Sequence, residues 1–371
     1  MVSDASARDR QFMERALFLA ERGRGRTSPN PIVGAVVVSA EGVVVGQGAH
    51  LQAGGPHAEI VALAAAGDRA RGATLYCTLE PCSHTGRTGP CVERIAAAGV
   101  SRVVAAVKDP NPRVAGAGFA YLRERGIEVT EDVCIDAASH QHAPFFTWVT
   151  QERPFVIVKA AASRDGFVGR PDARVQLTGP EANRFFHRQR AEVDAIAVGS
   201  GTVLVDDPRL TARGAYRIRP LTRVIFDWRG RISAEAAVFS TLDAGPVIMM
   251  VTRRAASERS SHFAHLTSKG VTVQSFETRS LEPALAWLAA RDIVTLLVEG
   301  GPALQAALAD DGLVDRVQWV VTPKTLGGGV AIAASIVRHA DARLPSTTRQ
   351  LGDDVLMEFD VHRTNRSDRS H

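Results

Sequence analysis

The chain has 371 residues, of which 45% are hydrophobic and 23% charged, and 44 lysines and arginines face 40 aspartates and glutamates. Single cores rarely grow beyond about 250 residues, so this length predicts two globular domains. No apolar run approaches the roughly 20 residues of a membrane-spanning helix, the N-terminus lacks a secretory pattern, and the basic residues form no stripe that would bind nucleic acid. We therefore expect a cytoplasmic protein with no membrane and no nucleic-acid partner.

The first half alternates helical and strand patterns. Apolar residues recur at helical spacing in some segments, and β-branched runs bounded by turn residues fill others. The expected elements are a helix at 8–22, strands at 33–39 and 42–48, a helix at 57–67, a strand at 73–80, a helix at 92–99 and strands at 102–107 and 126–130, with one more helix before the last strand. This order predicts a three-layer α/β/α domain.

The four cysteines are too few for a disulfide scaffold in a chain of this length, so unusual cysteine spacing indicates metal binding or catalysis. Cys77 lies inside a predicted strand and Cys134 lies far downstream. Neither has a partner at ligand spacing, so we expect both to be structural. Cys82 and Cys91 lie closer together, each near the point where a loop passes into a helix.

His57, Cys82 and Cys91 are predicted to hold one zinc ion per chain. Zinc binds imidazole and thiolate in a tetrahedron, and a catalytic site keeps the fourth position for water. Glu59, two residues after His57, is predicted to deliver protons to a ring nitrogen and to the departing amine. An H-x-E motif with a later P-C pair is the signature of zinc deaminases acting on nucleobases. Eight residues separate the two cysteines here, instead of the usual two.

The second half begins near Gln151, because the aromatic segment 140–154 ends in a proline before a fresh apolar strand and is predicted to be a short connector. The expected strands are 155–162, 194–199, 223–227, 246–252, 293–301 and 316–323, and the expected helices are 180–192, 281–291 and 302–310. We expect another α/β sheet. The predicted domains are therefore 1–151 and 152–364, followed by a disordered polar tail at 365–371.

Two glycine-containing segments of the second half, 199–202 and 299–308, follow predicted strands. Small residues there would let backbone amides at a helix N-terminus approach a phosphate. Neither segment is a Rossmann fingerprint, so by themselves they indicate only a nucleotide. Arg253 and Arg254 follow another strand, where they would either hold a 2′-phosphate or form a solvated basic turn.

At this point the sequence closely resembles the bifunctional deaminase/reductase family of riboflavin biosynthesis. In the first half the resemblance rests on SPNPIVGAVVV, GGPHAEIVAL, TLEPCSHTGRTGPC and KDPNPRVAGAG, and the long loop between the cysteines is typical of that family. In the second half it rests on KAAASRDG, GSGTVLVDDPRLTAR, EGGPALQAAL and TPKTLGGG. The resemblance implies a cytidine-deaminase-like first domain and a dihydrofolate-reductase-like second domain that uses NADPH.

The resemblance also implies two reactions on phosphorylated pyrimidines in a homo-oligomer. The first is hydrolytic loss of the 2-amino group of a diaminopyrimidinone ribosylamino 5′-phosphate, and the second is reduction of the ribosyl side chain to ribityl. By motif position, the deaminase substrate contacts are Asn30, His50, His84, Arg87 and Asn111. The reductase substrate contacts are Arg190, Leu210, Arg213 and Glu299, and its cofactor contacts are Ala161, Thr202, Asp206, Gly301, Pro302, Ala303 and Leu304. The candidates for proton handling in the reductase are Lys159, Asp206 and Glu299.

The chain departs from the family pattern between 166 and 180. Family members commonly have a tryptophan in this loop, whereas this chain has DARVQLTGP. Two alternatives therefore stay open. In one, the deaminase acts on tRNA or a free nucleobase and the second half is a recognition domain. In the other, the second half only binds a pterin, flavin or pyrimidine precursor.

Overall fold

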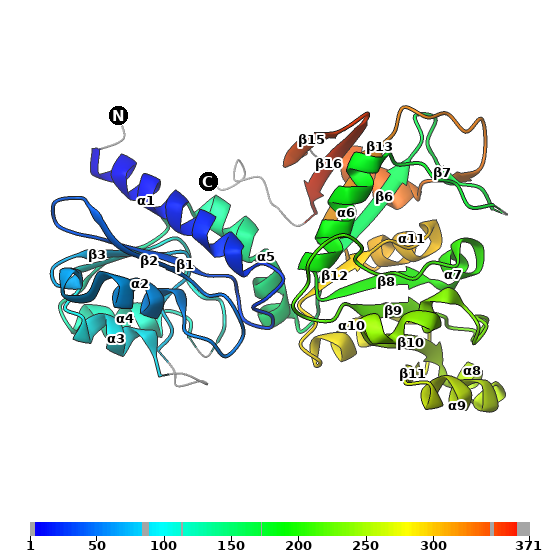
Figure 1. Ribbon diagram of the computed structural model, residues 1–371, viewed down its shortest axis with the longest axis horizontal. Coiled ribbons are helices and arrows are strands. Elements are labelled where there is room, and N and C mark those ends of the chain that lie inside the picture. The colour runs from blue at the N-terminus through cyan, green and yellow to red at the C-terminus, as the bar shows by residue number, and fades with distance from the viewer. Residues whose placement is uncertain (1–3, 84–88, 113, 172, 342–344, 362–371) are drawn as a thin grey trace, which may run out of the picture. The chain divides into compact units, whose positions relative to one another are not determined.

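The structure is a computed structural model that describes residues 4–83, 89–112, 114–171, 173–341 and 345–361 (Figure 1). The chain divides into two compact units, residues 1–152 and 153–371, which are treated separately below. His84, Arg87 and the expected tail at 365–371 lie outside the described residues. Among the helices of the described part, none combines the length and the apolar character needed to cross a membrane.

The first unit is built on a five-stranded sheet of order β2-β1-β3-β4-β5. Strand β1 is antiparallel to β2 and β3, whereas β3, β4 and β5 are parallel. The strands are β1 Gly34–Val38, β2 Val44–Ala49, β3 Thr74–Cys77, β4 Arg102–Ala105 and β5 Glu128–Thr130. The helices are α1 Asp4–Ala20, α2 Ala58–Ala66, α3 Cys91–Ala97, α4 Ala117–Glu124 and α5 Ile135–Gln151, with short 3₁₀ turns at Glu21–Gly23 and Gly67–Ala70.

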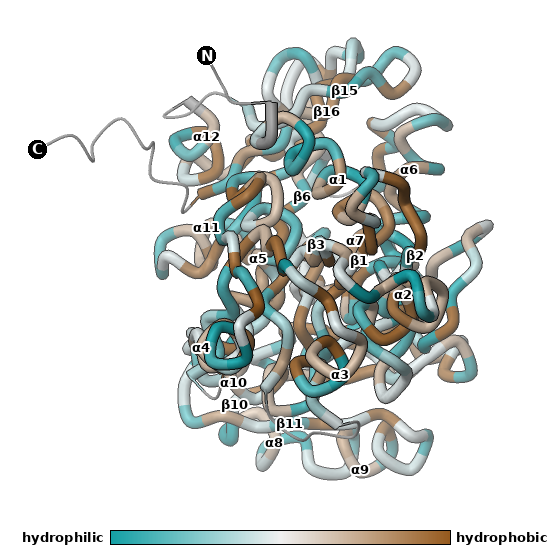
Figure 2. Tube along the Cα trace, turned by 90° about the vertical axis from the view of Figure 1, so that its left-hand side faces the viewer, coloured by the Kyte–Doolittle hydropathy of each residue, from teal (hydrophilic) through white to brown (hydrophobic). Residues whose placement is uncertain are grey.

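Helices cover both faces of this sheet. Figure 1 shows α1 on one face and α2, α3 and α4 on the other, and α5 contacts α1. Brown and teal alternate along the helices in Figure 2, as expected of elements that are apolar on one face only. The predicted three-layer α/β/α arrangement is confirmed.

Two glycines of β2 set the position of helix α2. A Cβ on Gly46 would collide with the carbonyl oxygen of Ala62, and a Cβ on Gly48 would collide with that of Ala58. The backbone of α2 therefore lies directly on the strand, at a distance that only glycine permits. Because α2 begins one residue after His57, this contact fixes how close the predicted metal ligand lies to the sheet.

The prediction that 140–154 is a connector is wrong, because Ile135–Gln151 forms helix α5 with Pro144 inside it. The connector was predicted from the aromatic residues and from Pro154, although Pro144 also costs the helix one backbone hydrogen bond. Here burial of one helix face outweighs that loss: Ala138, His142 and Phe145 are all buried. The imidazole Nε2 of His142 lies 3.1 Å from the carbonyl oxygen of Thr78, which ties α5 to the end of β3.

The second unit is built on a nine-stranded sheet of order β11-β10-β9-β8-β12-β6-β13-β16-β15. The strands from β11 to β13 in this order are parallel, and β16 and β15 add an antiparallel edge. The strands are β6 Phe155–Ala162, β8 Ala195–Gly199, β9 Thr222–Phe226, β10 Val247–Thr252, β11 Thr272–Phe276, β12 Thr295–Val298, β13 Arg316–Val321, β15 Thr347–Leu351 and β16 Asp354–Asp360, and a small separate sheet pairs β7 Phe167–Gly169 with β14 Val330–Ala331.

The helices of the second unit lie on both faces of the large sheet. They are α6 Pro180–Glu192, α7 Ser200–Asp206, α8 Arg253–Glu258, α9 Ser260–Ser268, α10 Leu281–Ala289, α11 Pro302–Asp310 and α12 Ala334–Asp341, with a 3₁₀ segment at Ala237–Ala244. Successive side chains of a strand point to opposite faces. Ala160 of β6 belongs to the core formed with α10, α11 and α12, whereas its neighbour Ala161 packs with α6. This agrees with the α/β class expected from the sequence.

The chain changes direction between β8 and β12, which are neighbours in the sheet. After β8 it continues through α7 toward β9 on one side, and after β12 it continues through α11 toward β13 on the other. A crevice opens at such a switch point, outside the carboxyl ends of the strands, and ligands of open α/β sheets bind there.

A buried ion pair holds the start of the second unit. Arg153 and Asp315 form two hydrogen bonds of 2.6 and 2.8 Å, and their side chains are only 8% and 3% exposed. We expect Asp315→Ala to lower the free energy of unfolding of this unit by about 3–5 kcal/mol, because Arg153 would stay buried without its partner. Urea unfolding measures the loss. Glu181→Ala, which breaks an exposed pair with Arg184, is the control and should cost less than about 1 kcal/mol.

Burial lowers the pKa of His142 to about 4, so the imidazole is neutral in the folded chain at pH 5 while it is protonated in the unfolded chain. The unfolded state then binds more protons, and stability falls as the pH falls below about 6.5. Between pH 7 and pH 5 this group alone should cost about 2 kcal/mol. We expect His142→Gln to reduce the pH-dependent loss by that amount. Urea unfolding at both pH values, followed by hydrogen exchange of peptides from residues 1–152, tests this, and equal losses in both proteins would contradict it.

Candidate active sites

Three predicted ligands of the first unit lie together. His57 is the N-cap of α2, Cys91 is the first residue of α3, and Cys82 lies in the loop after β3. The imidazole Nδ1 of His57 is 3.5 Å from Sγ of Cys82 and 3.2 Å from Sγ of Cys91, and all three ligand atoms lie within 4.8 Å of one another. With Zn–N bonds of about 2.0 Å and Zn–S bonds of about 2.3 Å, a tetrahedral zinc ion requires separations of this size.

The surroundings favour the charged form of the Cys82 thiol. The backbone N–H of Cys91 donates to Sγ of Cys82 at 3.3 Å, at the start of α3 where the helix dipole stabilises negative charge. A hydrogen bond from Cys91 lowers the pKa of Cys82 to about 4, and the same bond raises the pKa of Cys91. A divalent cation at this position would favour the thiolate form of both.

Glu59 lies beside these ligands with only 3% of its surface exposed. Burial raises the pKa of its carboxyl group, despite the opposing effect of His57. Its Oε2 has no hydrogen-bond partner among the described residues. An unpartnered buried carboxylate oxygen is costly, so its presence next to a metal-type ligand set indicates that Glu59 acts on a bound molecule.

A cavity of about 320 Å³ adjoins the ligand cluster. Asn30, His50 and Asn111, three of the predicted substrate contacts, line it. His50 Nδ1 lies 3.0 Å from the carbonyl oxygen of Pro56, so Nδ1 carries the proton and Nε2 accepts from Asn30 Nδ2 at 3.2 Å. Burial lowers the pKa of His50, which keeps this tautomer neutral. The other two predicted contacts, His84 and Arg87, lie outside the described residues.

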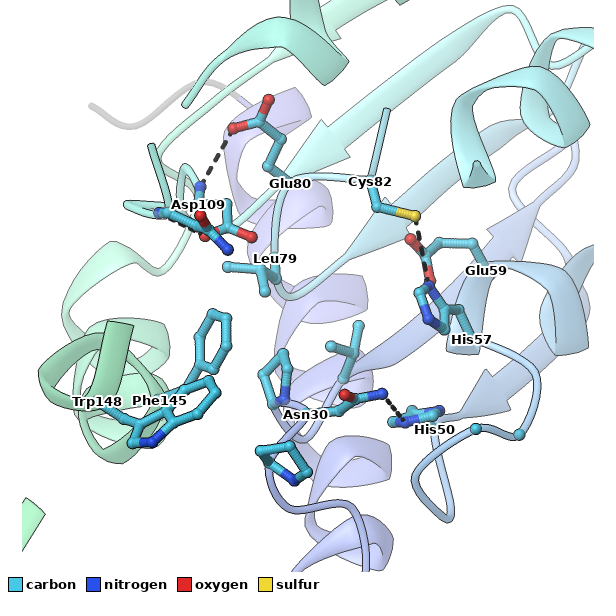
Figure 3. A pocket seen from close by; sticks show the side chains of 16 residues that line it. Asn30, His50, His57, Glu59, Leu79, Glu80, Cys82, Asp109, Phe145 and Trp148 are labelled. Atoms are coloured by element: carbon cyan, nitrogen blue, oxygen red, sulfur yellow. Dashed lines mark hydrogen bonds between the residues drawn. The ribbon is translucent and has the colours of Figure 1, made fainter. Parts of the chain in front are cut away.

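Sequence reasoning missed several residues that line this cavity, among them two aromatic and two acidic residues. Phe145 and Trp148 come from α5, which was expected to be a connector, and Figure 3 shows them on the side opposite His57, Glu59 and Cys82. Asp109 accepts a hydrogen bond of 2.8 Å from the backbone of Asn111, and Glu80 accepts three from backbone amides. The sequence Asp-Pro-Asn-Pro at 109–112 is typical of a turn in which the aspartate accepts a hydrogen bond from the backbone two residues later, so this role of Asp109 could have been predicted.

Two adjoining cavities of about 280 and 300 Å³ lie in the second unit, where β8 and β12 end. The first contains nine of the predicted residues: Lys159, Ala161, Arg190, Thr202, Asp206, Leu210, Glu299, Gly301 and Pro302. The second shares four of these and adds Ala303 and Leu304. Arg213 lines neither of the two cavities, and its exposed guanidinium Nη2 lies 3.3 Å from His187 Nε2.

Arg190 and Glu299 form the strongest charge pair of the first cavity. Nε and Nη2 of Arg190 each donate to one carboxylate oxygen of Glu299 at 2.7 Å. Burial would raise the pKa of Glu299, but the charge and hydrogen bonds of Arg190 outweigh it and hold this pKa below its usual value. Burial lowers the pKa of the neighbouring Lys159 and raises that of Asp206. The cavity therefore holds an ionised, paired carboxylate next to an amine and a carboxyl whose charged forms are disfavoured.

The second cavity has room for a cofactor against the backbone. Gly169 and Gly201 line it, and a Cβ added to either would meet nothing within 4 Å, so each glycine borders open space. Thr202 Oγ1 accepts from the backbone N–H of Gly301 at 3.0 Å and ties the segment after β8 to that after β12. A flat ring or a pyrophosphate can approach a wall without side chains closely.

The segment that departs from the family pattern still borders the first cavity. Arg174, Gln176 and Thr178 are among its lining residues. Nζ of Lys324 donates to the carbonyl oxygen of Gln176 at 2.6 Å, which ties this segment to the glycine-rich turn at 322–329. This segment therefore forms one wall of the first cavity.

Two family models match the chain. Residues 6–107 match the cytidine and deoxycytidylate deaminase zinc-binding region, and residues 154–351 match the RibD C-terminal domain. The riboflavin biosynthesis protein RibD of Aquifex aeolicus is 38% identical over 355 residues, which cover 95% of this chain and 98% of that protein. RibD of Escherichia coli is 36% identical over 375 residues, which cover 95% of this chain and 99% of that protein.

Solved structures agree along the whole chain. RibD of Acinetobacter baumannii, form 1, is similar with a TM-score of 0.82 at 34% identity, covering 96% of this chain and 99% of that one. A diaminohydroxyphosphoribosylaminopyrimidine deaminase/5-amino-6-(5-phosphoribosylamino)uracil reductase from Thermotoga maritima has a TM-score of 0.84 at 34% identity and the same coverage. These matches confirm the resemblance drawn from the motifs, together with zinc and NADPH as cofactors. The chain belongs to the RibD family and is a riboflavin-biosynthesis enzyme that joins a deaminase to a reductase.

Proposed function

We propose that the first unit removes the 2-amino group of 2,5-diamino-6-(5-phosphoribosylamino)pyrimidin-4(3H)-one by hydrolysis, and that the second unit then reduces the ribosyl side chain to ribityl phosphate. The name of the Thermotoga maritima relative supports both substrates. The observation that carries the deaminase half is the unpartnered, buried Oε2 of Glu59 beside His57, Cys82 and Cys91.

Glu59 is the proton carrier of the proposed deamination. When bound by the three ligands, zinc supplies a water molecule of lowered pKa. Loss of ammonia from a ring carbon also requires one proton at a ring nitrogen and one at the departing amine. Glu59 is suited to both transfers, because no other described side chain occupies its Oε2 and because its position on α2 is fixed by the contact with β2.

The remaining cavity residues bind the substrate in this proposal. Asn30, His50 and Asn111 offer hydrogen bonds to the ring and its substituents. Burial keeps His50 neutral, so it can bind an uncharged pyrimidinone without an opposite charge on the ring. Phe145 and Trp148 supply an apolar wall for the ring. His84 and Arg87 are also proposed substrate contacts, and the planar fork of Arg87 suits the substrate phosphate.

In the proposed reduction, NADPH supplies a hydride to the ribose-derived carbon. The sugar ring opens, and the released oxygen needs a proton. Lys159 and Asp206 are the proposed sources. Burial lowers the pKa of Lys159, so its ammonium group gives up a proton more easily. Burial raises the pKa of Asp206, so its carboxyl group holds a proton that it can donate. Glu299 is paired with Arg190 and is proposed to orient that guanidinium toward the substrate.

The other contacts of the reductase follow its two cavities. The proposed cofactor contacts are Ala161, Thr202, Asp206, Gly301, Pro302, Ala303 and Leu304. The proposed substrate contacts are Arg190, Leu210 and Glu299, which line the first cavity, and Arg213, which lines neither cavity. The side chain of Arg213 is exposed and contacts His187.

We also propose 1–151 and 152–364 as the functional domains, a homo-oligomeric assembly and a cytoplasmic location. The division into units at residues 152 and 153 supports the first of these. Four unpaired thiols support a reducing compartment. Light scattering after size-exclusion chromatography measures the oligomeric state.

The deaminase proposal predicts that Glu59→Gln lowers the rate of ammonia release by about 100- to 10,000-fold, the range that positioned acids and bases contribute. Zinc content should stay at one ion per chain, because the three ligands are unchanged. The control is Glu93→Gln on the exposed side of α3, which should leave the rate unaltered. Ammonia release retained in Glu59→Gln would refute the proton-carrier role.

The reductase proposal predicts that the deaminated sugar phosphate, supplied directly, supports NADPH oxidation in the wild type and in Glu59→Gln. Glu299→Gln should lower kcat/KM by about 30-fold or more, because it leaves the guanidinium of Arg190 buried without its carboxylate. The exposed Glu282→Gln on α10 is the matched control. If the wild type failed to oxidise NADPH, the second unit would instead be a module that binds a pterin, flavin or pyrimidine precursor.

A further inference from the structure

The loop between α7 and β9 carries two of the proposed substrate contacts, Leu210 and Arg213. Leu210 lines the first cavity and is only 4% exposed. Its φ is +56°, a left-handed backbone conformation that is costly for a bulky residue and persists only where the surrounding structure holds it. The groups that hold this loop therefore decide whether Leu210 stays at the wall of the cavity.

Helix α6 holds the loop at two points directly after Leu210. His187 and Arg190 lie three residues apart on this helix, so they share one face. Nη1 of Arg190 donates to the carbonyl oxygen of Thr211 at 3.1 Å, and Nδ1 of His187 accepts from the backbone N–H of Arg213 at 3.2 Å. One anchor thus fixes a backbone acceptor of the loop, and the other fixes a backbone donor.

The anchor at Arg213 requires a neutral imidazole. Nδ1 of His187 accepts a hydrogen bond only when it carries no proton, so the single proton of the neutral ring lies on Nε2. Nη2 of Arg213 lies 3.3 Å from this Nε2, which is then itself a donor. His187 therefore accepts from the backbone of Arg213 and not from its guanidinium, whose donors can bind a phosphate instead.

The two anchors respond differently to pH. A guanidinium stays protonated at every physiological pH, whereas an ordinary imidazole gains its second proton near pH 6.5. Burial lowers the pKa of His187, and the positive charges of Arg190 and Arg213 lower it further. The carboxylate of Glu299 and the carbonyl group of Thr211 oppose this shift but do not cancel it. The ring is therefore neutral at pH 7.5 and becomes protonated only in acid.

Protonation breaks the anchor at Arg213. Nδ1 then carries a hydrogen atom that faces the backbone N–H of Arg213, and the imidazolium adds a positive charge beside two guanidinium groups. We propose that His187 is a positioning residue of the reductase: its neutral ring holds residues 210–213 at the first cavity, and its protonation releases them and weakens binding of the sugar phosphate. This inference rests on the proposed reductase function.

The test compares two substitutions of His187 in the full chain at pH 7.5, with NADPH and the deaminated sugar phosphate. His187→Asn keeps an acceptor, because its amide oxygen replaces Nδ1, whereas His187→Leu has none. KM for the sugar phosphate should rise about 3- to 10-fold in His187→Leu, the value of one neutral hydrogen bond, and stay within about twofold of the wild type in His187→Asn. Neither kcat should change, because His187 does not line the first cavity.

The matched control is His265→Leu on the exposed side of α9, which should leave KM unaltered. An equal rise of KM in His187→Asn and His187→Leu would overturn the inference, because the acceptor would then be irrelevant. A fall of kcat with KM unchanged would also overturn it, since His187 would then act on the reaction itself.

The pH dependence of KM gives a second readout. Between pH 7.5 and pH 5.5, KM should rise at least about twofold more in the wild type than in His187→Asn, because an amide does not titrate. The substrate phosphate, whose second pKa is about 6, gains a proton equally in both measurements, so the difference between the proteins belongs to the imidazole. Equal pH dependence would contradict the proposal. So would a wild-type KM that falls in acid, which would mean that the imidazolium binds the phosphate itself.

Hydrogen exchange tests the anchor without turnover. At pH 7.5, peptides that span residues 207–214 should exchange faster in His187→Leu than in the wild type and in His187→Asn. The same exchange in all three proteins would refute the role of His187. If the wild type oxidised no NADPH, the proposed reduction would fail, and the exchange comparison would still decide whether His187 holds this loop.

Discussion

The carboxylate of Glu80 accepts hydrogen bonds from the backbone amides of Asp109, Gly116 and Gly118, at 3.2, 3.0 and 2.9 Å. A buried carboxyl group needs such partners, and here they come from the loop between β4 and α4 and from the first turn of α4. The same carboxylate lies two residues before Cys82, so one interaction fixes the metal-binding loop and the turn with Asn111 against each other. The cavity between them keeps its shape because neither wall can move without leaving Glu80 unpaired.

In the second unit, a buried aspartate also joins two segments of the chain. Asp194 accepts hydrogen bonds from the backbone amides of Val294 and Thr295 and pairs with Arg219, which joins β8 to β12 at the amino end of the strands. At the carboxyl end, Arg190 and Glu299 neutralise each other. Glu59 and Glu299 thus represent opposite uses of a buried carboxylate. One keeps an oxygen without a protein partner, and the other gives both oxygens to a guanidinium.

The sequence grouped His57, Cys82 and Cys91, and the structure brings their side chains together, because each lies at or near the start of a helix that packs on the same sheet. It also predicted most strands of the two sheets, where continuous β-branched runs are unambiguous. It failed at α5, where the aromatic residues and Pro154 indicated a short connector, whereas burial of one helix face explains the helix. The cavity wall formed by Phe145 and Trp148 was missed for the same reason. Arg190 and Glu299 are 109 residues apart in the sequence. Hydrophobic periodicity predicts local elements only, so it could not show that these two side chains form a pair. The exposed position of Arg213 was equally invisible.

The two glycines of β2 have a consequence for how this enzyme tolerates mutation. Neither touches the metal ligands, the cavity or a proposed substrate contact, yet both are in contact with the helix that begins at His57 and carries Glu59. Any other residue at Gly46 or Gly48 would push that helix away from the sheet and carry a ligand and the proton carrier with it. A substitution at either glycine would therefore lower the deaminase activity before it unfolded the sheet, although neither residue belongs to the active site.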